Sequence, residues 1–132
     1  MTLFEGGCLC GQVRWQASAA PANVRICHCR SCQLATGAPF FARAMFLAGD
    51  LHWQGETSRW PSSDRLDRLS CARCGTPVFA QPHDPPARIG VALASFDQPA
   101  AVVPDMHIWV TRKLAWVRLD DGLPQHPEGA PR

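Results

Sequence analysis

The sequence predicts a mainly β domain with a short helical turn, and two features carry this prediction. Short stretches that are apolar, or that alternate between apolar and polar residues, recur along the 132 residues. Ten glycines and twelve prolines separate these stretches and supply the turns. A chain of this length fits one domain. We expect that domain to span residues 1–120, and residues 121–132, which lack apolar periodicity, to form a flexible tail.

The expected strands follow one another closely enough to pair antiparallel. They are predicted, in chain order, at residues 11–17, 23–29, 39–47, 64–71, 76–81, 88–96, 107–110 and 114–119. In the first of them Val13, Trp15 and Ala17 fall on one face, which is the pattern of a half-buried strand. One or two helical turns are expected over residues 30–36, ended by Gly37 in a left-handed conformation.

Charge and hydropathy disfavour several classes of function. Thirteen basic and eleven acidic residues give a formal net charge of +2 without a basic run, which argues against nucleic acid as the main partner. The N-terminal residues have neither the basic nor the apolar region of a signal peptide. The most apolar segment, residues 38–49, is interrupted by Arg43 and is too short to span a bilayer. We therefore expect a cytoplasmic protein without a membrane role.

Seven cysteines in a reducing compartment indicate metal ligands or reactive thiols rather than disulfides. They fall into three sets: Cys8 with Cys10, Cys27 with Cys29 and Cys32, and Cys71 with Cys74. Two pairs and one triplet divide most naturally into a site of four thiols and a site of three.

The four-thiol site is predicted to hold a structural zinc ion on Cys8, Cys10, Cys71 and Cys74. Residues i and i+2 of an extended strand point to the same face, which would place the sulfurs of Cys8 and Cys10 side by side. The Cys-x-x-Cys pair is followed by Gly75, which is free to adopt a positive φ in a knuckle turn. Four thiolates make the closed tetrahedral site that is typical of structural zinc.

The three-thiol site is predicted to hold a catalytic zinc ion on Cys27, Cys29 and Cys32. Three protein ligands and one open position are the arrangement of catalytic zinc. His28 is expected on the opposite strand face, so it is disfavoured as the fourth ligand. Three thiolates around Zn²⁺ leave a charge of −1 and a soft metal, which favours a sulfur ligand over an activated water. We expect the fourth partner to come from outside, as a substrate thiolate or a small carbonyl compound.

The chain also resembles a known family over nearly its whole length. Four motifs in this order carry the resemblance: GGCLCGQVRWQA (6–17), CHCRSCQLATGAPFFA (27–42), CARCGTPVF (71–79) and HIWVTRKLAWVRLDDGLP (107–124). They are similar to those of the glutathione-dependent formaldehyde-activating enzymes, whose domain is shared with centromere protein V. Two positions depart from the family pattern, Ser70 before the Cys-x-x-Cys pair and Ala115 before Trp116, and both changes leave every thiol in place.

The resemblance implies a β fold of the Mss-four-like type with two zinc ions. By motif position, the four-thiol set looks structural and the three-thiol set looks catalytic. The implied activity is that of a carbon–sulfur lyase, in which glutathione adds to formaldehyde to give S-hydroxymethylglutathione. Glutathione and a small aldehyde are thus the implied partners, and two zinc ions are the implied cofactors.

Two other functions stay open at this point: a non-catalytic zinc module that binds another macromolecule, and a thiol-redox protein in which Cys29 and Cys32 form a disulfide. Arg25 and Arg30 flank the triplet and are candidates to hold glutathione carboxylates. A general base is not identified by the sequence, where His28, His52 and His107 are candidates by residue type alone.

Overall fold

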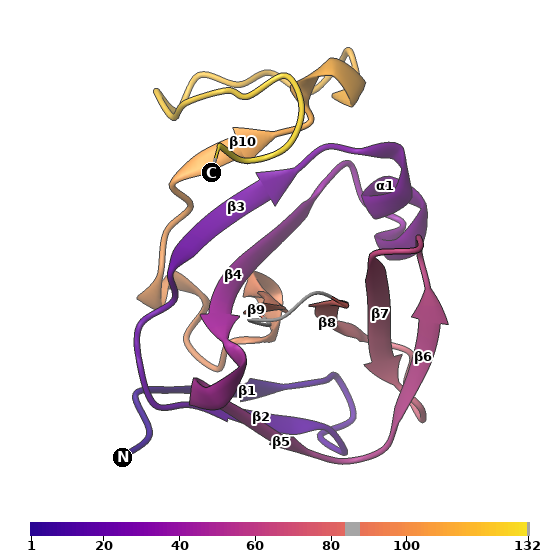
Figure 1. The fold of residues 1–132 in the computed structure, drawn as a ribbon, viewed down its shortest axis with the longest axis vertical. Helices are drawn as coiled ribbons and strands as arrows, with labels where there is room; N and C mark the ends of the chain where they lie inside the picture. The colour runs from indigo at the N-terminus through magenta and orange to yellow at the C-terminus, as the bar shows by residue number, and fades with distance from the viewer. Residues whose placement is uncertain (84–87, 132) are drawn as a thin grey trace.

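The computed structural model describes residues 1–83 and 88–131 and confirms a mainly β architecture (Figure 1). Its strands are β1 (Phe4–Gly7), β2 (Arg14–Ala17), β3 (Asn23–Cys27), β4 (Phe41–Leu47), β5 (Leu51–Gln54), β6 (Thr57–Pro61), β7 (Leu66–Cys71), β8 (Pro77–Pro82), β9 (Arg88–Ala92) and β10 (Met106–Ile108). The α-helix α1 (Arg30–Thr36) follows β3, and short 3₁₀ turns lie at η1 (Ala48–Asp50), η2 (Leu93–Ser95), η3 (Pro99–Ala101) and η4 (Val110–Arg112).

A three-stranded antiparallel sheet, in the order β1-β2-β5, lies across one end of the molecule (Figure 1). Its inner face is the predicted row of Val13, Trp15 and Ala17, each fully buried. The Trp15 ring meets the Phe96 ring edge to face at 4.7 Å between centroids, and its Nε1 donates to Ser95 Oγ at 3.0 Å. The apolar body of this tryptophan is therefore packed while its polar atom has a partner.

The larger sheet has seven strands in the order β10-β3-β4-β9-β8-β7-β6. Its two faces bury different clusters, because successive side chains alternate between them. One face joins Trp15 in a core with members such as Phe46 and Val91. The other face buries a smaller cluster that includes Cys27, Cys32 and Ala80. The smaller cluster brings the three-thiol set into contact with the sheet.

The helix prediction is confirmed over its whole range. Residues 30–36 are helical, and Gly37 caps the helix at φ 67° with its N–H bonded to Gln33 O. Gly37 suits this position because it has no Cβ to oppose the left-handed conformation.

Some strand predictions are wrong. Residues 114–119 form no strand, because the Val117 N–H closes a turn onto Leu114 O and the Lys113 ammonium binds the carbonyls of both residues. The strand β10 pairs with β3 in parallel rather than antiparallel fashion, since a long excursion of the chain separates them. Three strands, β1, β5 and β6, were not predicted; their sequences lack a long apolar alternation.

The C-terminal segment lies beside β10 (Figure 1). The N–H of His107 donates to Pro124 O, and the N–H of Trp109 donates to Glu128 O. The domain boundary at residue 120 and the flexibility of residues 121–132 stay predictions. Among the helices within residues 1–83 and 88–131, none has the length and apolar character needed to cross a bilayer.

The close approach of β1 to the η2 turn predicts a severe effect for Gly6→Ala. A Cβ at Gly6 would collide with the Ser95 carbonyl oxygen and lie 2.8 Å from Trp15 Cζ2. Because backbone would have to move, we expect a loss of about 3 kcal/mol in the free energy of unfolding, measured by chemical denaturation. Gly49→Ala is the matched control, since a Cβ there meets nothing within 4 Å. Equal stability of the two variants would contradict this packing.

Candidate metal centres

The four-thiol cluster brings together two turns that are distant in sequence. Its sulfur atoms, from Cys8, Cys10, Cys71 and Cys74, all lie within 4.8 Å of one another. The first two cysteines lie in a tight turn after β1, where Gly11 N donates to Cys8 O. The second two flank the turn after β7, where Gly75 has φ 78° and its N–H donates to Cys71 O.

The spacing of these sulfurs fits a tetrahedral metal ion. Cys8 Sγ lies 3.7 Å from Cys10 Sγ, which lies 3.8 Å from Cys71 Sγ. A tetrahedron with zinc–sulfur bonds of about 2.3 Å has edges of about 3.8 Å. The cysteines are all free thiols, so no disulfide competes for these atoms. This cluster could hold a metal ion, and its four sulfurs would close the coordination.

Hydrogen bonds from the protein support thiolates in this cluster. The Val13 N–H donates to Cys8 Sγ at 3.2 Å, and the Cys74 N–H donates to Cys71 Sγ at 3.4 Å. Hydrogen bonds from Thr76 lower the pKa of the Cys74 thiol to about 5. Donors of this kind stabilise the deprotonated form, which is the form that binds metal.

The three-thiol cluster lies where β3 passes into α1. Cys27 is the last residue of β3, Cys29 is the N-cap of α1, and Cys32 lies in its first turn. Their sulfurs lie within 4.8 Å of one another, so this cluster too could hold a metal ion. Cys27 and Cys32 are buried, whereas Cys29 is partly exposed, so the cluster is open on the Cys29 side.

The prediction that extended strands carry the paired cysteines is wrong for both clusters. Cys8 and Cys10 lie in a turn, and only Cys27 of the central triplet lies within a strand. The turn and the helix N-terminus bring the same sulfurs together. The Cys32 N–H donates to Cys29 Sγ at 3.3 Å, so the capping bond of the helix also orients a thiol of the cluster.

Positive charge surrounds the central cluster. Arg68 Nη2 donates to Cys32 Sγ at 3.3 Å. The thiols of Cys27 and Cys29, followed by the charges of Arg43 and Arg68, lower the pKa of Cys32 to about 2. The thiols of Cys29 and Cys32, together with burial, raise the pKa of Cys27. The cluster therefore favours a thiolate on Cys32 even before a metal ion is considered.

An open pocket of about 500 Å³ lies over this cluster. Its wall contains two cysteines, four arginines, three serines and two apolar residues: Cys27, Cys29, Arg30, Arg43, Arg68, Arg112, Ser31, Ser62, Ser63, Leu66 and Trp109. Of the two arginines proposed from the sequence, Arg30 lines the pocket and Arg25 does not. The other arginines come from β4, β7 and η4, which no local motif connects to the cysteines.

Trp109 enters the pocket wall in an unusual backbone conformation. Its φ is 56°, the only positive φ at a non-glycine among the described residues. Its N–H donates to Glu128 O, and its carbonyl accepts from the Arg112 N–H. Left-handed backbone at a bulky residue is costly, and such positions are concentrated at functional sites. The C-terminal segment thus helps to hold two residues of the pocket.

His28 lies just after β3 rather than on a strand face, and its ring nitrogens are not among the ligand atoms that gather at the central cluster. It is fully buried, and its Nε2 lies 2.9 Å from His107 Nδ1. The other nitrogen of His107, Nε2, donates to Asp121 Oδ2 at 2.7 Å. Burial, more than the neighbouring His107, lowers the pKa of His28 to about 4, so this ring is neutral at pH 7. His52, the third candidate base, lies on β5 in the other sheet and is exposed.

The two hydrogen bonds that connect Asp121, His107 and His28 fix the tautomers of both histidines. Because the carboxylate accepts from His107 Nε2, a neutral His107 leaves its Nδ1 as an acceptor. His28 must then donate from Nε2. The result is a continuous hydrogen-bonded connection from the C-terminal segment to the residue between Cys27 and Cys29. Sequence inspection missed it, because Asp121 has no distinguishing local motif.

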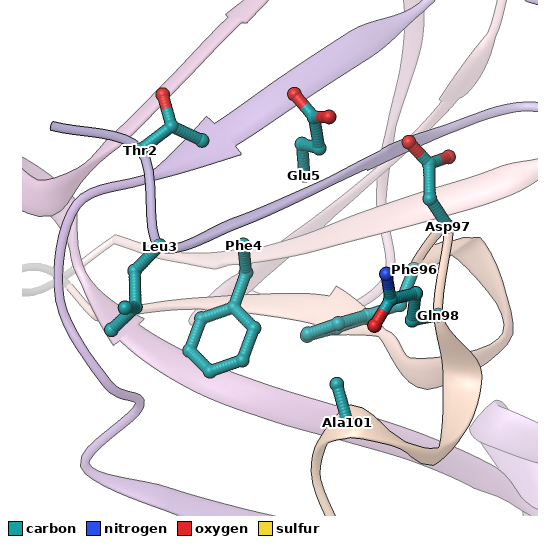
Figure 2. A pocket seen from close by; sticks show the side chains of 8 residues that line it. All are labelled: Thr2, Leu3, Phe4, Glu5, Phe96, Asp97, Gln98 and Ala101. Carbon is teal, nitrogen blue, oxygen red and sulfur yellow. The ribbon is translucent and has the colours of Figure 1, made fainter.

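Two other pockets lined by described residues lack this combination of thiols with several arginines. A pocket of about 340 Å³ beside β1 is lined by Phe4 and Phe96, with Glu5 and Asp97 at its edge (Figure 2). A larger pocket of about 700 Å³ contains aromatic residues and Cys8, but its one arginine, Arg14, is ion-paired with Asp97. The pocket over the central cluster is therefore the best candidate for a reactive site.

Comparison with known proteins agrees with the arrangement of cysteines. A family model described as glutathione-dependent formaldehyde-activating enzyme matches residues 3–112. The chain is also similar to the crystal structure of a Rhodobacter sphaeroides protein, with 24% sequence identity and a TM-score of 0.59. That match covers 76% of this chain and 97% of the other, and at this identity it supports the fold alone. No curated protein sequence matches.

The buried His107 predicts that Asp121→Ala destabilises the protein. The change leaves His107 Nε2 as a buried donor without its acceptor. We expect the thermal unfolding midpoint to fall by a few °C, on the order expected for one lost hydrogen bond in a small domain. Asp120→Ala, at the exposed neighbouring position, is the control.

The pH dependence of this effect has a definite sign. The hydrogen bond from His107 lowers the pKa of Asp121 below its ordinary value of 3.8. A lowered folded-state pKa gives stabilisation that is fully present above the unfolded value and is lost as the pH falls through the folded value. The difference between wild type and Asp121→Ala should therefore be constant from pH 6 to pH 8. A difference that vanishes in that range would contradict the assignment.

Proposed function

Because this chain belongs to the family of glutathione-dependent formaldehyde-activating enzymes, we propose that it is a zinc-dependent carbon–sulfur lyase. Its proposed reaction is the addition of glutathione to formaldehyde, which gives S-hydroxymethylglutathione. The observation that supports this most is the cluster of three thiols, open on one side, beneath a pocket lined by cations. Three sulfur ligands and an accessible fourth position suit a soft metal that receives a thiol.

We assign the two clusters different roles. Cys8, Cys10, Cys71 and Cys74 would hold a structural zinc ion that joins the turn after β1 to the turn after β7. Cys27, Cys29 and Cys32 would hold the catalytic zinc ion. When bound there, zinc supplies a positive charge that favours the thiolate form of a thiol substrate.

The reaction needs no oxidant and no leaving group. The substrate sulfur loses its proton and forms a bond to the carbonyl carbon of formaldehyde, while the C=O π bond opens and its oxygen takes up a proton. The reverse reaction breaks the same carbon–sulfur bond. The pocket would hold the two small reactants together, which can by itself contribute several kcal/mol to lowering the barrier.

The protein side chains provide an electrostatic environment for this step. Arg68 donates to Cys32 Sγ and to Ser62 Oγ, so it is fixed between the cluster and the pocket wall. Together with Arg43 it offsets the negative charge of the three thiolates. Trp109 and Leu66 form the apolar part of the same wall.

The remaining expectations are part of the same proposal. Seven free cysteines, none of them in a disulfide, suit the reducing cytoplasm. The acidic and basic residues nearly balance, so small molecules rather than nucleic acids are the proposed partners.

The proposal predicts that Cys29→Ser removes activity and leaves the fold. Serine is a good N-cap, so α1 should still begin at Arg30. We expect zinc content to fall from two ions to one per chain. The rate of S-hydroxymethylglutathione formation should fall by more than the roughly 10–100-fold that loss of an outer-shell partner costs. Zinc is measured by elemental analysis, the rate by NMR, and the fold by circular dichroism.

Cys71→Ser is the contrasting variant, because it removes a ligand of the structural cluster. It should lower the unfolding midpoint by more than Cys29→Ser does, because it opens the cluster that joins two turns distant in sequence. Full activity and two zinc ions in Cys29→Ser would refute the catalytic assignment. A wild-type protein that holds both ions but ignores thiols would instead favour a non-catalytic zinc module.

A further inference from the structure

The seven-stranded sheet is rich in arginine and poor in carboxylates. Among the described residues of its strands, Asp67 is the only acidic residue, and it is paired with Arg59 and His83. Asp67 and Arg68 are adjacent in β7, so they point to opposite faces. On the face that carries Cys27, the described strand residues therefore include no carboxylate to neutralise the arginines.

Strand register places these arginines on the same face as the central cluster. Arg25 of β3 is opposite Arg43 of β4, and Cys27 is opposite Phe41, two residues from Arg43. Farther across the sheet, Arg68 is opposite Ala80, which is itself opposite Gly90. The residues between the Arg43 and Arg68 strands are small, which leaves room for long side chains to lie over the sheet.

Arg43 is fitted into that space. A Cβ at Gly90 would lie 2.8 Å from Arg43 Cδ, so the absence of a side chain at Gly90 makes room for the arginine stem. The guanidinium carbon lies 5.8 Å from the centroid of the Phe41 ring. The stem of Arg43 thus lies against Gly90 and its guanidinium lies near the Phe41 ring. The side chain also lines the pocket.

The guanidinium of Arg43 lacks hydrogen-bond partners. Its Nε and Nη1 atoms are buried and have none. Two of the other three arginines in the pocket wall differ from it: Arg68 binds Cys32 and Ser62, and Arg30 donates to Gln33 Oε1. An unpaired buried cationic group is costly unless something in the functional state compensates for it.

We propose that Arg43 is the centre of a carboxylate subsite that makes this pocket selective for thiols bearing an acidic group. A carboxylate matches the planar fork of a guanidinium and would make charge-assisted hydrogen bonds with it. Arg112, exposed at the pocket edge, adds a second positive charge. This inference rests on the proposed function, since it takes the substrate to be a thiol. To that function it adds a basis for selectivity, namely the interaction of Arg43 with a carboxylate of the thiol substrate.

Charge counting supports an anionic ligand. Three thiolates and one Zn²⁺ would leave a formal charge of −1, whereas the pocket wall carries four arginines. The arginines exceed what is needed to neutralise the cluster. The excess is available for a ligand that brings negative charge with it.

The test compares small thiols that differ in one group. The probes are 3-mercaptopropionate, which carries a carboxylate, and 2-mercaptoethanol, which is neutral, each titrated calorimetrically into the zinc-loaded protein. We expect the wild type to bind the acid about 10-fold more tightly, the effect of one charge-assisted contact. In Arg43→Gln that preference should disappear, because the affinity for 3-mercaptopropionate should fall about 10-fold more than the affinity for 2-mercaptoethanol.

Two further variants make the comparison specific. Arg88→Gln removes an exposed arginine from the same sheet face but outside the pocket, and it should keep the preference. Arg43→Lys keeps the charge without the fork and should retain part of the preference, which also guards against a misfolded glutamine variant. S-methylglutathione, which has two carboxylates and no free thiol, should bind the wild type and not Arg43→Gln.

Several results would overturn the subsite. A wild type that binds both thiols equally has no acid selectivity. An equal loss of affinity for both thiols in Arg43→Gln would mean that the arginine serves only as a counter-charge to the cysteines. An equal effect of Arg88→Gln would mean that the overall positive charge of the sheet face, and not Arg43, produces the preference for the acid. If acid selectivity is found but formaldehyde does not react, the proposed function fails and the subsite stands.

Discussion

The mutual approach of thiols is the constraint on which the structure depends. Seven cysteines are distributed over more than sixty residues, yet their sulfurs gather at two points. Neutral thiols attract one another weakly, and thiolates repel, so neither cluster is favourable without a cation. Both clusters lie at the ends of strands, where a turn or a helix begins. A bound metal would therefore fix the connections between strands rather than the strands themselves.

The two faces of the larger sheet have different roles: one packs the main apolar core, and the other carries the central cysteines and the pocket. The face toward Trp15 is apolar and closely packed, with Phe46 and Phe96 around the indole. The opposite face carries the central thiols and arginine side chains. A polar pocket on one side is tolerated because the other side supplies the buried apolar area. The alternation of side chains in Asn23–Cys27 reflects this division.

Local features of the sequence predicted the parts of the site that depend on neighbouring residues. The division of cysteines, the helix before Gly37 and the buried row of Trp15 all follow from short-range spacing or periodicity. The arginines of the pocket could not be found in this way. Arg43 first appears as an interruption in an apolar segment, and Arg68 contacts a cysteine 36 positions away only because the sheet brings β7 to the helix. Long-range register of this kind is not encoded in any single segment.

The C-terminal segment has a consequence for handling the protein. It folds back along β10, and the N–H of Trp109 donates to Glu128 O, so this segment supports a residue in the wall of the central pocket. The N-terminus lies at the other end of the molecule, beside the small sheet (Figure 1). The two ends of the chain are therefore not equivalent as attachment points. Affinity tags, fluorophores and immobilising linkers are better placed at the N-terminus, because the C-terminal segment that would carry them supports the turn of Trp109.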